Sequence, residues 1–310
     1  MSGHNKTIYI IGAGAIGKVL AVFLSKNGKK VILVRGSVMN EPSIKSTIHV
    51  ELANHSIESA EIEQVTLDAL DELNGIVILT NKSFGNPDLA LKLKEKAYGS
   101  PIVFLQNGLG VEQSFIEEGF KEIYRCVLFA TSQTVAENTF RFQPVSESAI
   151  GVILGTTTQL NNIVQAVNNS QFPFKAEDHI QKLIWKKAIC NSVFNSICPL
   201  LDIDNGIFYR NEKALSIAKR VIHECVAVAN KANVALTEDE VVANLLIISK
   251  ASDGQLISTL QDIRNKRPTE IDTFNFAIVE SARANDPSQS IRETKLLGEL
   301  TKLKSELNLC

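Results

Sequence analysis

The sequence predicts an α/β N-terminal domain with a parallel sheet of the Rossmann type, which binds a dinucleotide, followed by an all-α C-terminal domain. Two observations support this prediction. A strand, a glycine-rich loop, a helix and a second strand follow one another near the N-terminus, and strand patterns stop near His179. The 310 residues suffice for two domains that each bury a core. We expect the dinucleotide-binding domain over residues 1–176 and the helical substrate-binding and catalytic domain over residues 177–310.

The composition argues against several classes of partner. The formal net charge is −2 and no basic block occurs, which argues against a nucleic acid, because a phosphate backbone requires a basic surface. The five cysteines are odd in number and form no CxxC pair, which favours a reducing compartment over a disulfide framework. The five histidines show no metal-ligand spacing, so we predict no metal site.

An apolar run over residues 8–24 lies close to the N-terminus. It is shorter than a typical membrane span of about 20 residues, and glycines and Lys18 interrupt it. It has neither the basic n-region nor the cleavage site of a signal peptide. We therefore expect a soluble, cytoplasmic protein with no membrane partner.

The run TIYIIGAGAIGKVLAVFLSKNGKKVILVRG carries the clearest motif. A short apolar strand over residues 8–11 is followed by the pattern GxGxxG, by a helix predicted from about Ala15 to Lys26, and by a second strand over residues 30–34. The first glycine permits a tight turn, the second lets the backbone approach a pyrophosphate, and the third lets the helix pack close to the strand. The helix N-terminus then presents unpaired N–H groups to the phosphates. The alternative is a glycine-rich turn of another α/β protein. We assign cofactor binding to Gly12, Ala13, Gly14, Ala15, Ile16 and Gly17.

The end of the second strand indicates which dinucleotide binds. NAD sites usually carry a carboxylate there for the ribose hydroxyls, whereas this strand ends in Arg35. A guanidinium cannot accept a hydrogen bond from a ribose hydroxyl, but it can pair with a 2′-phosphate. We therefore predict NADP(H) as the cofactor and Arg35 as the discriminating residue. The alternative is a solvated arginine at a strand end.

Two further apolar runs, residues 75–80 and 101–106, predict parallel strands that are buried on both faces. Lys82 follows the first run and Asn107 follows the second. Ligands of open parallel sheets bind outside the carboxyl ends of the strands, so we expect both residues at the cofactor. Otherwise each is an ordinary loop residue. Strands and a hairpin between about residues 123 and 154 extend the predicted sheet.

From about residue 179 onward, apolar residues recur at helical spacing. A further helix is expected after a break at Pro268. The other predicted helices cover residues 184–201, 213–234, 237–252, 255–265 and 291–310.

The stretch IWKKAICNSVFN, residues 184–195, is mostly apolar but carries Lys187, Asn191 and Asn195 at intervals of four. At about 100° per residue, the three side chains share one helix face, where burial without partners is costly. Reduction of a carbonyl requires a proton for the oxygen and positive charge where negative charge develops, and a lysine supplies both. The asparagines would then orient a polar substrate. The alternative is structural: Lys187 reaches solvent and the asparagines bond between helices.

The chain resembles the 2-dehydropantoate 2-reductase, or ketopantoate reductase, family over essentially its whole length. The resemblance rests on GAGAIG, the strand-end Arg35, TNKSF, QNGLG, WKKAICNSVFN, DNG and STLQDIRNKRPTEID, of which the last is the most specific. The departures are modest. The family often has a proline after the second asparagine of the helix, where this chain has Ser196 and places a proline at Pro199 instead, which alters where the helix can bend. Asn81 stands where the family varies.

The resemblance implies NADPH-dependent reduction of 2-dehydropantoate to (R)-pantoate, a step toward pantothenate and coenzyme A. It implies that Lys187 is the general acid and that Glu270, on the helix expected after Pro268, assists through a hydrogen bond to the substrate. Lys82 and Asn107 would line the junction of cofactor and substrate. Ser258 would lie nearest the substrate carboxylate. The implied substrate-binding residues are Asn191, Asn195, Asn205 and Ser258. The implied partner is a small 2-oxo acid, and a homodimer is compatible with this assignment.

Two other functions stay open at this point. The first is a reductase of a different 2-oxo acid that uses the same cofactor and the same lysine. The second is a non-catalytic NADPH-binding sensor, which would keep the glycine loop but lack Lys187 or Glu270. Both of these residues are present.

Overall fold

The computed structural model describes residues 6–36 and 38–309. The chain divides into two compact units, and each is described by itself. The first unit contains the described residues up to Gln106 together with Val111–Ile180, and the second contains Asn107–Gly110 and the chain from Gln181 onward. Among the helices of the described chain, none is long and apolar enough to cross a membrane.

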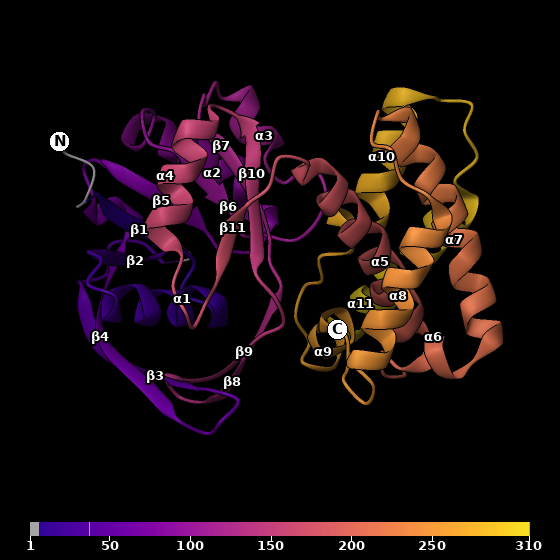
Figure 1. Cartoon of the computed structure of the whole chain (residues 1–310), viewed down its shortest axis with the longest axis horizontal. Helices are drawn as coiled ribbons and strands as arrows, with labels where there is room; N and C mark the ends of the chain where they lie inside the picture. Colours follow the sequence, from indigo (N-terminus) through magenta and orange to yellow (C-terminus); the bar gives the residue numbers. More distant parts are fainter. Residues whose placement is uncertain (1–5, 37, 310) are drawn as a thin grey trace. The chain divides into compact units, whose positions relative to one another are not determined.

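The first unit is built on one mixed sheet (Figure 1). Its strand order is β11-β10-β7-β6-β5-β1-β2-β4-β3-β9-β8, and the six strands from β7 to β4 are mutually parallel. The strands are β1 (Thr7–Ile11), β2 (Val31–Arg35), β3 (Ile44–Glu51), β4 (Ile57–Thr66), β5 (Gly75–Leu79), β6 (Ile102–Phe104), β7 (Ile123–Val127), β8 (Ala130–Ala136), β9 (Thr139–Pro144), β10 (Ser148–Leu154) and β11 (Phe174–Ala176). The chain runs outward in both directions from β1 and β5, which is the switch point where such sheets bind ligands.

Helices cover both faces of this sheet. Helices α1 (Ala15–Lys26) and α4 (Thr157–Val167) share one apolar core with one face of the strands. Helices α2 (Asn86–Lys96) and α3 (Gln113–Glu117) share a second core with the opposite face. Two short 3₁₀ turns, η1 (Leu67–Ala69) and η2 (Ser83–Gly85), follow β4 and β5. The predicted Rossmann-type α/β architecture is therefore confirmed.

Capping signals explain the observed end of α1 and the observed start of α4. Helix α1 ends at Lys26, and Gly28 follows with a φ of +71°, which glycine adopts without strain. The hydroxyl of Thr156 accepts the N–H of Gln159 at the start of α4. Such signals predict boundaries because they satisfy backbone groups that the helix itself leaves unpaired.

Strands β3 and β4 have no counterpart in the sequence prediction. They pair antiparallel over eight residues, from Ile44–Gln64 to Glu51–Ile57. Most of their side chains are polar and partly exposed, and only a few apolar side chains on one face, such as Ile48, are buried. A two-sided strand of this kind lacks the continuous apolar run that identified β1, β5 and β6.

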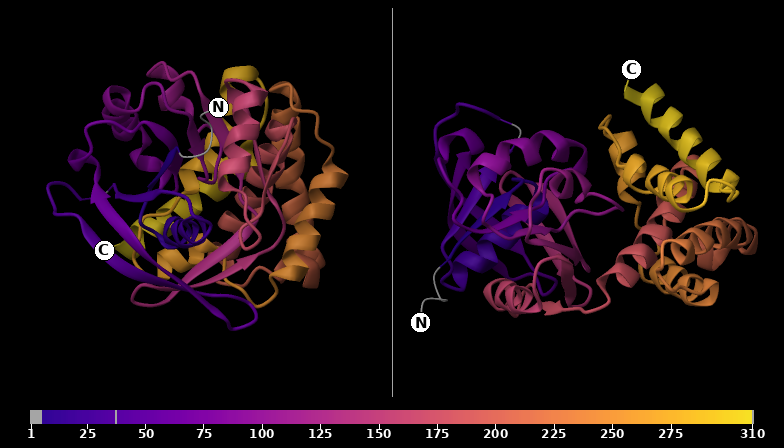
Figure 2. Two further views of the ribbon diagram at one scale, coloured as in Figure 1. Left: turned by 60° about the vertical axis from the view of Figure 1, so that its left-hand side comes forward. Right: turned by 90° about the horizontal axis from the view of Figure 1, so that it is seen from above.

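The second unit is all-helical, which confirms that part of the prediction. Its core contains buried side chains of α5, α7, α8 and α10 (Figure 2, where its helices run from rose to yellow). The helices are α5 (Ile180–Leu201), α6 (Ile207–Arg210), α7 (Glu212–Lys231), α8 (Glu238–Ala251), α9 (Ser258–Arg264), α10 (Asn275–Asn285) and α11 (Arg292–Leu309), with the 3₁₀ turn η3 (Ile271–Thr273) before α10. Pro199 lies inside the last turn of α5, so the helix continues past it to Leu201.

Candidate active site

The glycine loop connects β1 to α1, and two of its three glycines are required by close packing. A Cβ on Gly12, whose φ is +121°, would lie 2.5 Å from the backbone nitrogen of Asn81. A Cβ on Gly17 would lie 2.0 Å from the carbonyl oxygen of Gly12. The space in front of Gly14 is open, because a Cβ there would meet no atom within 4 Å. The loop is therefore shaped to keep its middle accessible.

The start of α1 is suited to an anion. Gly14 is the N-cap residue, and no side chain caps the first turn, which also contains no acidic residue. Ala13, Ala15 and Ile16 are half-buried around it. Backbone N–H groups and the helix dipole therefore face the open side of the loop, which fits a pyrophosphate. The predicted loop residues thus form one local structure.

Arg35 ends β2 as predicted, but its guanidinium already has partners. Nη1 donates to the Glu41 carboxylate at 2.6 Å, and Nη2 donates to the carbonyl oxygen of Pro42 at 2.7 Å. The side chain is only 13% exposed, and its Nε is buried with no hydrogen-bond partner among the described residues. A 2′-phosphate that binds Arg35 would have to replace Glu41.

A cavity of about 390 Å³ opens beside this strand end. It lies between the residues that follow β2 and β4 and one side of α2, from its first turn to its last residue. Its lining combines apolar side chains with two lysines and two aspartates: Gly36, Val38, Met39, Leu67, Asp68, Gly85, Asp88, Leu89, Lys92 and Lys96. Sequence reasoning did not predict this cavity, because its walls come from three separate segments that carry no shared motif.

The loops that carry Lys82 and Asn107 are joined by a buried pair of amides. Asn86 Nδ2 donates to Gln106 Oε1 at 2.8 Å, and Gln106 Nε2 donates back to Asn86 Oδ1 at 2.9 Å. Gln106 Nε2 also lies 2.9 Å from the carbonyl oxygen of Asn81. The residues just before Lys82 and Asn107 are therefore held together at the ends of β5 and β6.

The three polar residues that share one face of α5, which we call the α5 stripe, differ in burial. Lys187 and Asn191 are half-buried, whereas Asn195 is only 1% exposed. The Asn195 side-chain oxygen accepts from the Thr259 hydroxyl at 2.8 Å, and from the Thr259 N–H and the Ser258 hydroxyl at 3.3 Å each. Its Nδ2 donates to the carbonyl oxygen of Asn191 at 3.0 Å. Asn195 thus brings α5 and the start of α9 together.

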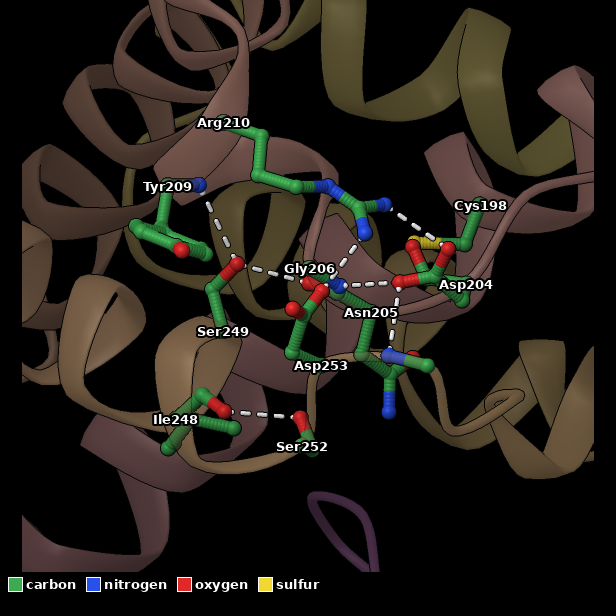
Figure 3. Close-up of polar contacts among 11 residues, drawn as sticks. Cys198, Asp204, Asn205, Gly206, Tyr209, Arg210, Ile248, Ser249, Ser252 and Asp253 are labelled. Carbon is green, nitrogen blue, oxygen red and sulfur yellow. Dashed lines mark hydrogen bonds and ion pairs between the residues drawn. The ribbon is translucent and has the colours of Figure 1, made fainter.

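Asn205 lies in the turn between α5 and α6, next to an ion-pair cluster (Figure 3). The hydrogen bond from Arg210 lowers the pKa of Asp204 to about 2, so this carboxylate is ionised throughout the pH range of an enzyme assay. The Asn205 amide oxygen is buried and has no hydrogen-bond partner in the part of the chain that the structure describes. Asp204 is the first residue of the DNG motif, but the sequence analysis assigned a role only to Asn205, and Arg210 belongs to no recognised motif.

Glu270 does not lie on a helix, which corrects the expectation that it follows Pro268 into one. It directly precedes the 3₁₀ turn η3, and its carbonyl oxygen accepts the N–H of Thr273 at 2.9 Å. The loop at Asn107 packs against this turn. Gly108 has a φ of +100°, and a Cβ there would lie 2.5 Å from Thr273 Cβ. The segments of Glu270 and Asn107 are therefore neighbours.

No group of three or more His, Cys, Asp or Glu side chains that could hold a metal ion occurs among residues 6–36 and 38–309. The arrangement offers a cradle for a dinucleotide in the first unit. In the second unit it offers a lysine, several amides, a hydroxyl and a carboxylate. This set can orient a polar anion and move a proton.

A family profile described as Ketopantoate reductase PanE/ApbA matches residues 8–154. A second profile, for the C-terminal part of the same family, matches residues 179–293. Together they cover well over half of the chain. The chain belongs to the ketopantoate reductase family. It is accordingly an oxidoreductase, and both the glycine loop and the α5 stripe fall within the matched residues.

Individual relatives agree with this assignment. The 2-dehydropantoate 2-reductase of Pyrococcus abyssi (strain GE5 / Orsay) is 27% identical over 282 residues, which cover 89% of this chain and 91% of that protein. D-mandelate dehydrogenase, solved with NADH and anilino(oxo)acetate, has a TM-score of 0.83 at 20% identity and covers 98% of this chain and 100% of its own. A PanE/ApbA family ketopantoate reductase from Ralstonia eutropha JMP134 has a TM-score of 0.82 at 22% identity, with the same coverage. The two structures show that the fold is shared.

Proposed function

We propose that this ketopantoate reductase family member reduces 2-dehydropantoate to (R)-pantoate with NADPH. The observation that carries the proposal is that the family match extends over both units, including the glycine loop and the segment from Lys187 to Glu270. The relative from Pyrococcus abyssi is named for this reaction. We assign cofactor binding to residues 1–176 and substrate binding and catalysis to residues 177–310.

Lys187 is the proposed proton donor. Reduction of a 2-oxo group adds a hydride to the carbonyl carbon and a proton to the carbonyl oxygen, and bound NADPH supplies the hydride. Lys187 donates the proton and places positive charge beside the oxygen as negative charge develops there. It is half-buried on α5, one turn before Asn191, so the two side chains can face the same substrate.

The remaining residues orient the substrate. The Ser258 hydroxyl donates to the substrate carboxylate, the Glu270 carboxylate accepts from a substrate hydroxyl, and the amides of Asn191 and Asn205 bind other polar groups. For Asn195 we propose an indirect role. Its amide already bonds to Ser258 and Thr259, so it fixes the start of α9 and with it the Ser258 hydroxyl.

The cofactor assignment rests on the first unit. The open space in front of Gly14 accepts the pyrophosphate, and the neighbouring cavity of about 390 Å³ is large enough for the adenine end. Arg35 pairs with the 2′-phosphate once Glu41 has released it. Lys82 and Asn107, which follow the ends of β5 and β6, line the nicotinamide end, where the substrate meets the cofactor.

The test is a spectrophotometric assay of purified protein with ketopantoate. We expect the NADPH absorbance band to disappear rapidly, with little loss of the NADH band in a parallel reaction. Formation of (R)-pantoate is checked by chromatography on a chiral phase. Stable NADPH absorbance despite tight NADPH binding would reject ketopantoate as substrate and would leave the cofactor assignment standing.

Arg35→Ala tests the choice of cofactor. Loss of a charged hydrogen-bond partner for the 2′-phosphate should raise the KM for NADPH about tenfold or more, whereas the KM for NADH should stay within about twofold. Arg141→Ala is a suitable control, because Arg141 is an exposed arginine of β9 that pairs with Glu51. An unchanged ratio of NADPH to NADH efficiency in Arg35→Ala would refute the role of Arg35.

A reductase of another 2-oxo acid is the second candidate. The similar fold of D-mandelate dehydrogenase motivates it, since oxidation of a 2-hydroxy acid yields a 2-oxo acid. A panel of 2-oxo acids distinguishes the two candidates. Ketopantoate carries a 4-hydroxyl and a gem-dimethyl group that need matching partners, so a site built for it should reduce pyruvate and phenylglyoxylate much more slowly.

A further inference from the structure

Asn205 has a fixed backbone and an unpaired side-chain oxygen. Its N–H donates to the carbonyl oxygen of Gln255 at 2.9 Å, and its own carbonyl oxygen accepts from the Ser249 hydroxyl at 2.6 Å. The residue is only 7% exposed, yet its Oδ1 has no hydrogen-bond partner among residues 6–36 and 38–309. A buried amide oxygen without a partner is unfavourable, so this oxygen is available to accept a hydrogen bond from a ligand group.

Asp204 ties the turn that carries Asn205 to a second segment. Its Oδ1 accepts the N–H of Gly206 at 2.8 Å and the N–H of Gly254 at 3.1 Å. Its Oδ2 accepts from Arg210 Nη2 at 2.7 Å. One carboxylate therefore joins the residues between α5 and α6 to the residues between α8 and α9, and the latter lead directly to Ser258.

Asp253 is the third charged residue of the cluster. Arg210 Nη1 donates to Asp253 Oδ1 at 2.6 Å. A Cβ on Gly206 would lie 1.8 Å from this Asp253 oxygen, so a larger residue at that position would displace the Asp253 carboxylate. In Figure 3 the Asn205 side chain points away from Arg210, on the other side of the Asp204 carboxylate.

We propose that Asp204 is a positioning residue that holds the Asn205 amide toward a polar group of the substrate. Arg210 and Asp253 support it by holding the Asp204 carboxylate in place. The Asp204 carboxylate also sets the distance between the Asn205 turn and the segment before Ser258. This assignment rests on the proposed function of Asn205 and Ser258 as substrate-binding residues, and it adds residues that touch no substrate themselves.

The exposed ion pairs of the cluster contribute little to folding, which makes the proposal testable. The side chains of Arg210 and Asp253 are 39% and 41% exposed, and ion pairs of this kind add little to stability because water screens them. Removal of the Asp204 carboxylate also deprives the N–H groups of Gly206 and Gly254 of their acceptor, so we expect a local rearrangement of the two turns with at most a small loss of Tm. It should misplace Asn205, and a misplaced binding group raises the KM for the substrate more than it lowers kcat.

The first experiment compares Asp204→Ala, Asp204→Asn and wild type. Steady-state kinetics are measured with the 2-oxo acid that wild type reduces best, so that a failure with ketopantoate does not remove the test. For Asp204→Ala we expect the KM for this acid to rise about 10- to 100-fold, with the KM for NADPH within about twofold. Asp204→Asn keeps an oxygen for the two backbone N–H groups, so its KM should lie between those of wild type and Asp204→Ala.

A double-mutant cycle with Asn205→Ala separates positioning from a general structural effect. If Asp204 acts through Asn205, the loss caused by Asp204→Ala should nearly vanish in the Asn205→Ala background. Asp202→Asn is the matched control. Asp202 belongs to the same turn and pairs with Arg264 at 3.0 Å, and its carboxylate is not part of the ion pairs among Asp204, Arg210 and Asp253, so the kinetics of Asp202→Asn should match wild type.

Several outcomes would overturn the proposal. One is an equal loss of kcat/KM from Asp204→Ala in the wild-type and Asn205→Ala backgrounds. The others, all for Asp204→Ala, are a parallel rise in the KM for NADPH, a large drop in Tm, or unchanged kinetics. The proposed function fails separately, if wild type reduces a different acid in place of ketopantoate. If wild type reduces no 2-oxo acid, both proposals are rejected together.

Discussion

At the scale of single residues, the α5 stripe shows how one sequence pattern serves two purposes. Lys187, Asn191 and Asn195 share a helix face by their spacing, but only the first two are accessible enough to meet a ligand. The Asn195 side chain is hydrogen-bonded to Ser258, Thr259 and the α5 backbone. The hydrogen bonds of Asn195 therefore support the structural interpretation for this residue, and the functional interpretation stays a prediction for Lys187 and Asn191.

Replacement of Lys187 by alanine tests the proposed acid. We expect kcat/KM to fall about 100-fold or more, because proton transfer from a positioned group contributes about that much. Lys186→Ala is the matched control. Lys186 neighbours Lys187 on the helix and pairs with Glu240 at 3.4 Å on another face, so its removal should cost less than about twofold.

Binding measurements complete this comparison. The Kd for NADPH should be the same in both lysine variants and in wild type, which separates proton transfer from cofactor binding. A loss of less than about threefold in Lys187→Ala would contradict the assigned role. An equal loss in Lys186→Ala would point instead to damage of the helix.

At the scale of elements, the loop between β1 and α1 separates packing from ligand access. Gly17 is needed because the Gly12 carbonyl oxygen occupies the space of a side chain, whereas Gly14 faces open space. The GxGxxG pattern predicted a packing role for Gly17 and a ligand role for Gly14, and the structure supplies the contacts behind the first of these. The structure assigns Gly12 and Gly17 to the fold and leaves Gly14 to the ligand.

Alanine at Gly14 and at Gly17 should therefore have opposite effects. Gly17→Ala should destabilise the fold by about 1–3 kcal/mol, as overpacking does, and lower the Tm. Gly14→Ala should leave the Tm within the scatter of surface substitutions and raise the Kd for NADPH about tenfold, since its methyl group stands where the pyrophosphate approaches. Differential scanning fluorimetry and a fluorescence titration with NADPH measure the two effects. Tight NADPH binding by Gly14→Ala would argue that the phosphates lie elsewhere.

At the scale of the whole molecule, the chain consists of two compact units with separate apolar cores. The division falls at Ile180, in the first turn of α5, and the short loop Asn107–Gly110 groups with the helical unit. Most of the proposed roles follow this division, with the cofactor residues in the first unit and the substrate groups in the second, and Asn107 is the exception. A ligand that binds only folded protein stabilises the part that it contacts.

Hydrogen exchange with and without NADPH tests this division of roles. We expect slower exchange at residues 12–20 and at the start of α2, which borders the cavity beside Arg35. Helix α7 should exchange at the same rate in both conditions, because its buried face packs in the core of the other unit. Protection of α7 as strong as that of the glycine loop would contradict a cofactor site in the first unit. Nicotinamide mononucleotide, which lacks the adenine end, should give little protection near α2 when it is added in place of NADPH.

Much of the fold could be predicted from the sequence. Apolar runs and helical periodicity identified β1, α1, β5 and the longer helices of the second unit, because each of these signals reflects backbone pairing or burial within a few residues. The β3–β4 hairpin could not be found this way. Its stability comes from pairing between residues on two strands. The alternation of apolar and polar side chains along each strand is too weak to indicate a strand.

The sequence by itself determined the glycine loop, the strand-end positions of Arg35, Lys82 and Asn107, and the common helix face of Lys187 and Asn191. Only the tertiary structure decided that Glu41 forms an ion pair with Arg35 and that Asn195 holds the start of α9. It also decided that Glu270 precedes a 3₁₀ turn and that Asp204 joins two turns distant in the sequence. The physical reason is the range of the interactions. Helical period and turn chemistry act over a few neighbouring residues, whereas a bond such as that between Asn195 and Thr259 joins positions 64 residues apart, so no local pattern contains it.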